Sequence, residues 1–108
     1  MIKRLFTGAA VALSLASAPA SAISTSDLVK VAKGMVAQSA PTWDDGYFYG
    51  YVIGTLENMP QMLCLPDKIT NGEIVNTAAY SIIRHSELYS LSASEMIRRI
   101  LMLEYSCK

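Results

Sequence analysis

The side chains of this chain that could carry out chemistry are two cysteines, one histidine, and serines and carboxylates that are scattered singly. None of the serines lies in the glycine pattern of a nucleophile elbow. His85, the lone histidine, falls at the end of a predicted helix. There a structural role at the helix dipole is favoured over a catalytic base or a metal ligand. The sequence therefore predicts a protein that is not an enzyme and that has no metal site and no cofactor.

The first 22 residues have the pattern of an export signal. Lys3 and Arg4 form a positive start, an apolar run covers residues 5–16, and residues 20–22 are the small residues of a cleavage site. The apolar run is shorter than the roughly 20 residues that cross a bilayer. We therefore predict a signal peptide over 1–22, and an exported mature domain over 23–108 with no membrane insertion.

Cys64 and Cys107 are the two cysteines of the chain, and neither belongs to a metal-type cluster. In an oxidising compartment they have one internal pairing, which we predict as a disulfide. The bridge would close a loop of roughly 44 residues, worth about 4 kcal/mol in the chain-entropy model. Such a bond, or a partner subunit, suits a small domain with a limited core.

The charge balance also restricts the partners. Of nine basic residues, Lys3 and Arg4 leave with the signal, so seven basic residues face nine acidic ones in the mature domain. This slight negative charge argues against nucleic acid, or an anionic membrane surface, as the partner.

Four helices are expected to position these residues. They are a first helix capped by residues 24–26 and ending near Ala37, a central helix from Thr42 to Asn58, a third from Thr70 to His85, and a fourth from Ser92 to the chain end. Capping boxes begin the last two. In the fourth helix, Met96, Ile97, Ile100, Leu101 and Leu103 are expected to face inward. The predicted fold class is all-α, a small four-helix domain stapled by one disulfide.

Two connecting segments stand out. Residues 59–66 form an apolar loop with two prolines, which we expect to pack on the core, with cover by a partner as the alternative. Residues 86–91 are expected to be an irregular connector.

Glycines recur every four residues in the central helix, at Gly46, Gly50 and Gly54, and Tyr47 and Tyr51 follow the same spacing one position later. Each set forms a stripe on a helix. Because a glycine inside a helix costs about 1 kcal/mol relative to alanine, we expect this helix to be mostly buried and closely packed. Packing within one subunit is the favoured interpretation, and close approach of a second subunit is the alternative. A homodimer is predicted.

An ordered series of short motifs resembles the Rap/Tai family of type VI secretion immunity proteins. The motifs are Gly50-Tyr51-Val52-Ile53-Gly54, Cys64-Leu65-Pro66, Thr70 at a helix start, His85-Ser86-Glu87 and Tyr105-Ser106-Cys107. Proline is common in the family where this chain has Ser86 and Ser106. The resemblance implies a small all-helical periplasmic protein, commonly a homodimer, that binds and blocks a peptidoglycan amidase.

The resemblance does not transfer the toxin-binding residues, so we nominate loops that a rigid scaffold can insert into a cleft. The favoured candidates are Ser86, Glu87, Tyr89 and Ser90, with Met62 in the second loop. The alternative for residues 86–91 is an ordinary solvated connector. The competing function is a periplasmic helical chaperone of the acid-stress type, which the single histidine and unexceptional carboxylate count disfavour.

Overall fold

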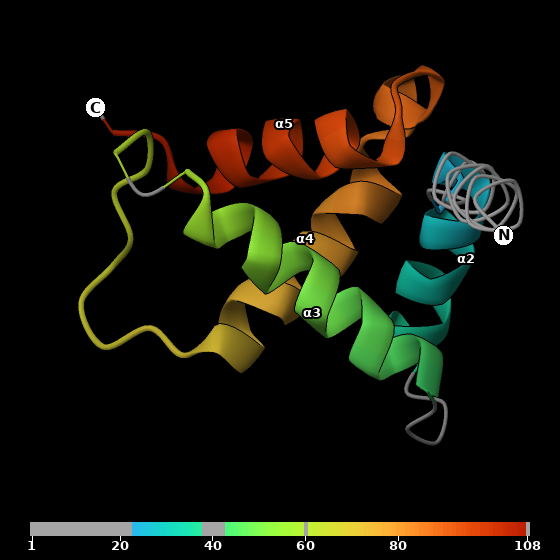
Figure 1. The fold of residues 1–108 in the computed structure, drawn as a ribbon, viewed down its shortest axis with the longest axis horizontal. Helices are drawn as coiled ribbons and strands as arrows, with labels where there is room; N and C mark the ends of the chain where they lie inside the picture. The colour runs from blue at the N-terminus through green and yellow to red at the C-terminus, as the bar shows by residue number, and fades with distance from the viewer. Residues whose placement is uncertain (1–22, 38–42, 60, 108) are drawn as a thin grey trace, which may run out of the picture.

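Four α-helices and one short 3₁₀ helix make up most of the described chain (Figure 1). They are α2 (Thr25–Val36), α3 (Trp43–Glu57), α4 (Asn71–Arg84), η1 (Ser86–Ser90) and α5 (Ala93–Tyr105). The structure, a computed structural model, describes residues 23–37, 43–59 and 61–107. The predicted all-α class and the four helices are confirmed. The predicted signal peptide and the Thr42 cap lie outside the described residues. The connector after α4 differs from expectation, because its residues 86–90 form η1.

The helix starts follow from local hydrogen bonding. The side-chain oxygens of Ser24, Thr70 and Ser92 accept hydrogen bonds from the backbone N–H three residues onward, over 3.2, 3.1 and 3.4 Å. Each bond satisfies one of the donors that lack a partner in a first helical turn. The caps expected before the first, third and fourth helices are therefore confirmed.

The core lies where α4 meets the other elements. Helix α4 contacts α2, α3, η1 and α5. The fully buried side chains include Leu28 of α2, Phe48 and Val52 of α3, Ile74 and Ile82 of α4, and Met96, Ile97, Ile100 and Leu101 of α5. Figure 1 shows α2 and η1 near one end of α5, and the loop after α3 at its other end. No helix among the described residues is long and apolar enough to cross a membrane.

Leu103 does not join this core, contrary to expectation. Its side chain is 55% exposed, whereas Leu101 is fully buried. Two residues along a helix correspond to a turn of about 200°, so Leu103 points away from the direction of Leu101.

Helix α3 is buried along one face and exposed along the other, so the expectation of a mostly buried central helix is wrong. Phe48, Val52 and Leu56 face the core. Gly46, Gly50 and Gly54 are exposed, and a Cβ atom built on any of them meets no atom of the described residues within 4 Å. Packing among the described residues therefore does not explain the glycine stripe. The interpretation that favoured internal packing is wrong for the described residues.

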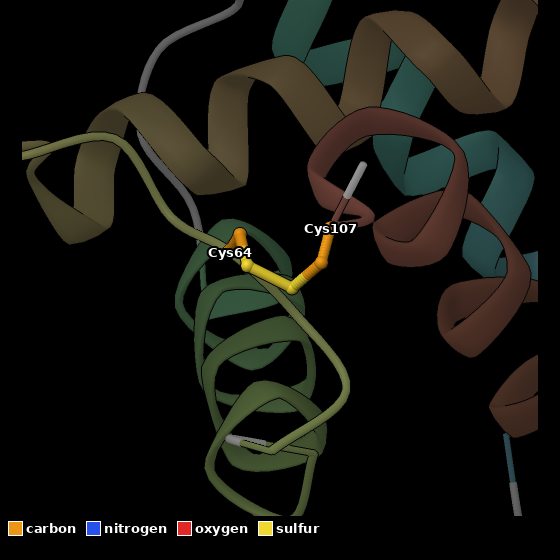
Figure 2. The surroundings of a disulfide bond; sticks show 2 residues. All are labelled: Cys64 and Cys107. Atoms are coloured by element: carbon orange, nitrogen blue, oxygen red, sulfur yellow. A yellow bond between two sulfur atoms is a disulfide. The ribbon is translucent and has the colours of Figure 1, made fainter.

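The predicted disulfide is present between Cys64 and Cys107, with a Cα–Cα distance of 4.9 Å. Figure 2 shows it joining the loop after α3 to the segment that follows α5. Two backbone interactions support the same junction: the Cys64 N–H donates to the Tyr105 carbonyl over 2.8 Å, and Leu63 forms an isolated antiparallel bridge with Ser106.

The apolar loop of residues 59–66 is partly buried in the core and partly exposed, so each of the two predicted environments applies to some of its side chains. Met59 and Leu63 are buried in the core, while Met62 and Leu65 are 46% and 40% exposed. The disulfide junction draws in only part of the loop, so the expectation of core packing is correct for the first pair alone.

Candidate functional site

The exposed part of η1 is formed by three polar side chains. Ser86, Glu87 and Ser90 are exposed, whereas Leu88 and Tyr89 are half-buried and pack against the core. Side chains three residues apart eclipse one another in a 3₁₀ helix, so Glu87 and Ser90 share an edge. This short element therefore presents a carboxylate and a hydroxyl together on the protein surface.

A pocket of about 300 Å³ lies between this element and α2. It is lined by Thr25, Ser26, Val29, Lys30, Lys33 and Tyr89. Two lysines and an aromatic ring thus border the hollow, while the carboxylate of Glu87 belongs to the neighbouring η1. We call the exposed residues Ser86, Glu87 and Ser90, together with this pocket, the η1 surface. Its exposed polar side chains, its pocket and its charges of both signs are features that a protein partner can match.

Tyr89 lies in this surface with its hydroxyl already bonded. Its Oη donates to the carbonyl oxygen of Ile82 over 2.9 Å. The sequence nominated Tyr89 beside Ser86, Glu87 and Ser90, and the structure brings all four onto η1. Of the four, Tyr89 is the one directed partly toward the core.

His85 ends α4 and is held by the backbone of that helix. Its Nδ1 lies 2.8 Å from the carbonyl oxygen of Ser81, which assigns the hydrogen to Nδ1 as donor. This geometry matches the expected structural role at a helix end.

Ser81, His85 and Glu104 form a polar cluster that has the residue types of a catalytic triad without its geometry. The Oγ of Ser81 lies 3.3 Å from both His85 Nδ1 and Glu104 Oε2, and Ser81 is fully buried. In a triad the imidazole lies between serine and carboxylate, and the serine faces the substrate. Here the serine lies between the other two and is closed to solvent, so the cluster joins α4 to α5.

No local sequence pattern indicates this cluster, because its members are separated by up to 23 positions. The sequence feature that points to a buried polar contact is Ser81, a polar residue within the apolar stripe of α4. A polar side chain at such a position needs a partner.

The second nominated segment lies elsewhere. Met62 belongs to the loop at the disulfide end of α5, whereas η1 precedes the other end (Figure 1). The 13-residue helix between them is about 20 Å long at 1.5 Å per residue. A pocket of about 240 Å³ at this end is lined by Leu56, Glu57, Leu63 and Leu65. Met62 and η1 therefore do not form one site.

The exposed face of α3 combines the glycine stripe with tyrosines. Tyr47 and Tyr49 are exposed, and the Tyr47 and Tyr51 rings lie 6.2 Å apart in a tilted arrangement. Burial, and then the neighbouring Tyr47, raise the pKa of Tyr51 above its usual value, while a hydrogen bond with Ser94 opposes the shift. The glycines leave a low surface beside these larger rings.

Among the residues that the structure describes, no group of three histidine, cysteine or carboxylate side chains lies close enough to hold a metal ion.

Comparison with known proteins agrees with the resemblance noted from the motifs. Neither the curated proteins nor the solved structures gave a match. The family model described as Rap1a immunity proteins matches residues 24–107, which includes every helix described above. Members of this family are in general not enzymes, and an immunity function implies binding to a secreted effector. The chain belongs to the family of Rap1a immunity proteins.

Proposed function

We propose that this protein acts in the periplasm and neutralises a peptidoglycan amidase that a type VI secretion system delivers, by binding the amidase and closing its substrate cleft. The family supports an immunity function against a secreted effector. The export-signal pattern of residues 1–22 supports the periplasm, where such an amidase meets its substrate.

The observation that carries the proposal is the η1 surface. Ser86, Glu87 and Ser90 stand on an element that is held by the core through Leu88 and Tyr89. An amidase cleft that accepts the peptides of peptidoglycan must bind carboxylates and amide groups. The carboxylate of Glu87 and the two hydroxyls offer the same hydrogen-bonding types, on a support that a cleft can surround.

We further propose that the protein forms a homodimer through the exposed face of α3. Three glycines there cost helix stability without a contact inside the described chain that would require them. Close approach of the same face of a second copy, across a two-fold axis, would use the low glycine surface and bury Tyr47 and Tyr49. Tyrosine suits such an interface because it combines apolar area with a polar tip.

The test is binding and inhibition with purified components. The mature protein is titrated into each candidate amidase from the same genome, with the affinity measured by calorimetry and the residual activity by release of peptidoglycan fragments. Glu87→Ala and Lys33→Ala alter the η1 surface. Glu57→Ala removes an exposed carboxylate near the disulfide end, and is the charge-matched control for Glu87→Ala.

We expect the wild type to inhibit one amidase, Glu87→Ala to weaken binding by about tenfold or more, and Glu57→Ala to leave binding unchanged. Wild-type protein that inhibits none of the amidases would refute the immunity assignment to this toxin class. Inhibition that survives Glu87→Ala and Lys33→Ala but is lost in Met62→Ala would move the binding surface to the disulfide end. Suppression of aggregation of unrelated acid-unfolded proteins would instead support the chaperone alternative.

A further inference from the structure

Three side chains fasten η1 and its flanking residues to the rest of the molecule. His85 Nδ1 donates to the carbonyl of Ser81, and Tyr89 Oη donates to the carbonyl of Ile82. On the far side of η1, Thr25 Oγ1 donates to the carbonyl of Leu91 over 2.5 Å. The donors come from α2, from η1 and from the end of α4. The segment is therefore fixed to two helices as well as to its own backbone.

The first two bonds fall on carbonyl groups that the helix itself leaves without partners. The last four carbonyls of an α-helix have no intrahelical N–H to accept, and Ser81 and Ile82 lie in the last turn of α4. The N–H of His85 also reaches the Ile82 carbonyl, over 3.3 Å. The side chains of His85 and Tyr89 thus satisfy the end of α4 and at the same time set the direction in which the chain leaves it.

η1 is a short element of five residues. Besides the bonds inside η1, backbone hydrogen bonds join it to its flanking residues, from Leu88 N–H to the His85 carbonyl and from Leu91 N–H to the Leu88 carbonyl. A 3₁₀ segment of this length has poorer hydrogen-bond geometry than an α-helix and needs support from its surroundings. The three side-chain bonds and the packing of Leu88 and Tyr89 provide that support.

We propose that Thr25, His85 and Tyr89 are positioning residues, which hold η1 in one conformation so that Glu87 and Ser90 are presented to the partner already arranged. A partner that binds an ordered segment does not have to supply the free energy of ordering it, and the affinity rises accordingly. The consequence for affinity rests on the proposed immunity function, whereas the ordering of η1 is a property of the free protein. Tyr89 is accordingly a support for the binding surface, and Glu87 and Ser90 are its contacts.

The main variant is Tyr89→Phe, which removes the hydroxyl and keeps the ring in the core. Tyr80→Phe is its matched control. Tyr80 is an exposed tyrosine of α4, and its hydroxyl has no hydrogen bond to the described residues. Amide hydrogen exchange of Leu88 and Leu91 in the free protein reports opening of η1. Loss of one such hydrogen bond should speed exchange of these two amides by about two- to tenfold.

Two further variants separate positioning from general stability. His85→Leu removes the donor to the Ser81 carbonyl, whereas His85→Asn keeps an amide N–H near the position of Nδ1 and should rescue the loss. Thr25→Val keeps the shape of the side chain and removes the hydroxyl bound to Leu91. Thermal unfolding of each variant shows whether the overall fold is kept.

We expect Tyr89→Phe, His85→Leu and Thr25→Val each to raise exchange in η1 and to weaken binding to the amidase by about two- to tenfold. Tyr80→Phe and His85→Asn should behave as wild type. Unchanged exchange at Leu88 and Leu91 in Tyr89→Phe would overturn the inference, as would faster exchange with undiminished affinity. If wild-type protein binds no amidase, the proposed function fails, and the exchange measurements on the free protein still decide whether these residues order η1.

Discussion

Gly50 is expected to reduce the stability of the isolated subunit, and Gly50→Ala should therefore increase it. Gly50 lies in the middle of α3, and its substitution introduces one methyl group on the exposed face. A Cβ atom at this position meets none of the described residues within 4 Å, so no steric cost is subtracted from the gain in helix propensity. That gain is about 1 kcal/mol for an exposed position inside a helix. For a domain of this size, it corresponds to a rise in melting temperature of about 4 to 8 °C.

The assay combines urea unfolding with sedimentation, because the same substitution should affect subunit and dimer in opposite ways. At concentrations where sedimentation shows a monomer, Gly50→Ala should raise the free energy of unfolding. At higher concentration it should weaken self-association, and Gly50→Leu should abolish it, since a large side chain keeps the second helix at a distance. Gly72→Ala, in the first turn of α4, alters a glycine outside this face and should leave self-association unchanged.

Three results would each refute part of the reasoning about this face. If the Gly50→Ala monomer is less stable than the wild type, the glycine serves a contact within the chain. A dimer that persists in Gly50→Leu would place the interface on another surface, and wild-type protein that stays monomeric at micromolar concentration would remove the dimer altogether.

Three further predictions concern the scaffold. Cys107→Ser should lower the free energy of unfolding by about 4 kcal/mol, the chain-entropy value for a separation of 43 residues, as measured by urea unfolding; a loss below about 1 kcal/mol would contradict it. Thr70→Ala should cost about 1 kcal/mol by removing the cap bond to the Glu73 N–H, and a variant as stable as the wild type would show that the bond contributes nothing. Because the pKa of Tyr51 is raised by burial and by Tyr47, the folded state holds this proton more tightly than the unfolded state. The resulting stability is present below about pH 10 and is lost as the pH rises through the folded-state pKa, so Tyr51→Phe should remove part of the alkaline decrease in unfolding free energy.

The helix boundaries could be predicted because they depend on neighbours in the sequence. Ser24, Thr70 and Ser92 each bond a backbone N–H three residues away, so the chain within one turn determines where the helix begins. The disulfide was predictable by count, since an exported chain with Cys64 and Cys107 has one internal pairing. The structure places the nominated residues Ser86, Glu87 and Ser90 on the surface of η1, and their role in binding a toxin stays a prediction.

The candidate site was predicted less completely because its geometry depends on separate elements. The bond from Thr25 to Leu91 joins residues 66 positions apart, and the bond from Ser81 to Glu104 joins α4 to α5. No local pattern specifies such pairs. Tyr89 was nominated from the sequence for toxin binding, whereas its hydrogen bond depends on the carbonyl of Ile82, which lies where α4 ends.

Helix α3 has two stripes that can be predicted from the sequence, and tertiary packing decides which of them is buried. Phe48, Val52 and Leu56 recur every four residues, and so do Gly46, Gly50 and Gly54, so the sequence determined that α3 has one large apolar stripe and one small-residue stripe. It did not determine which stripe faces the core. That choice was decided by packing, because burying the large side chains against α4 and α5 removes more apolar area from water than burying glycine does.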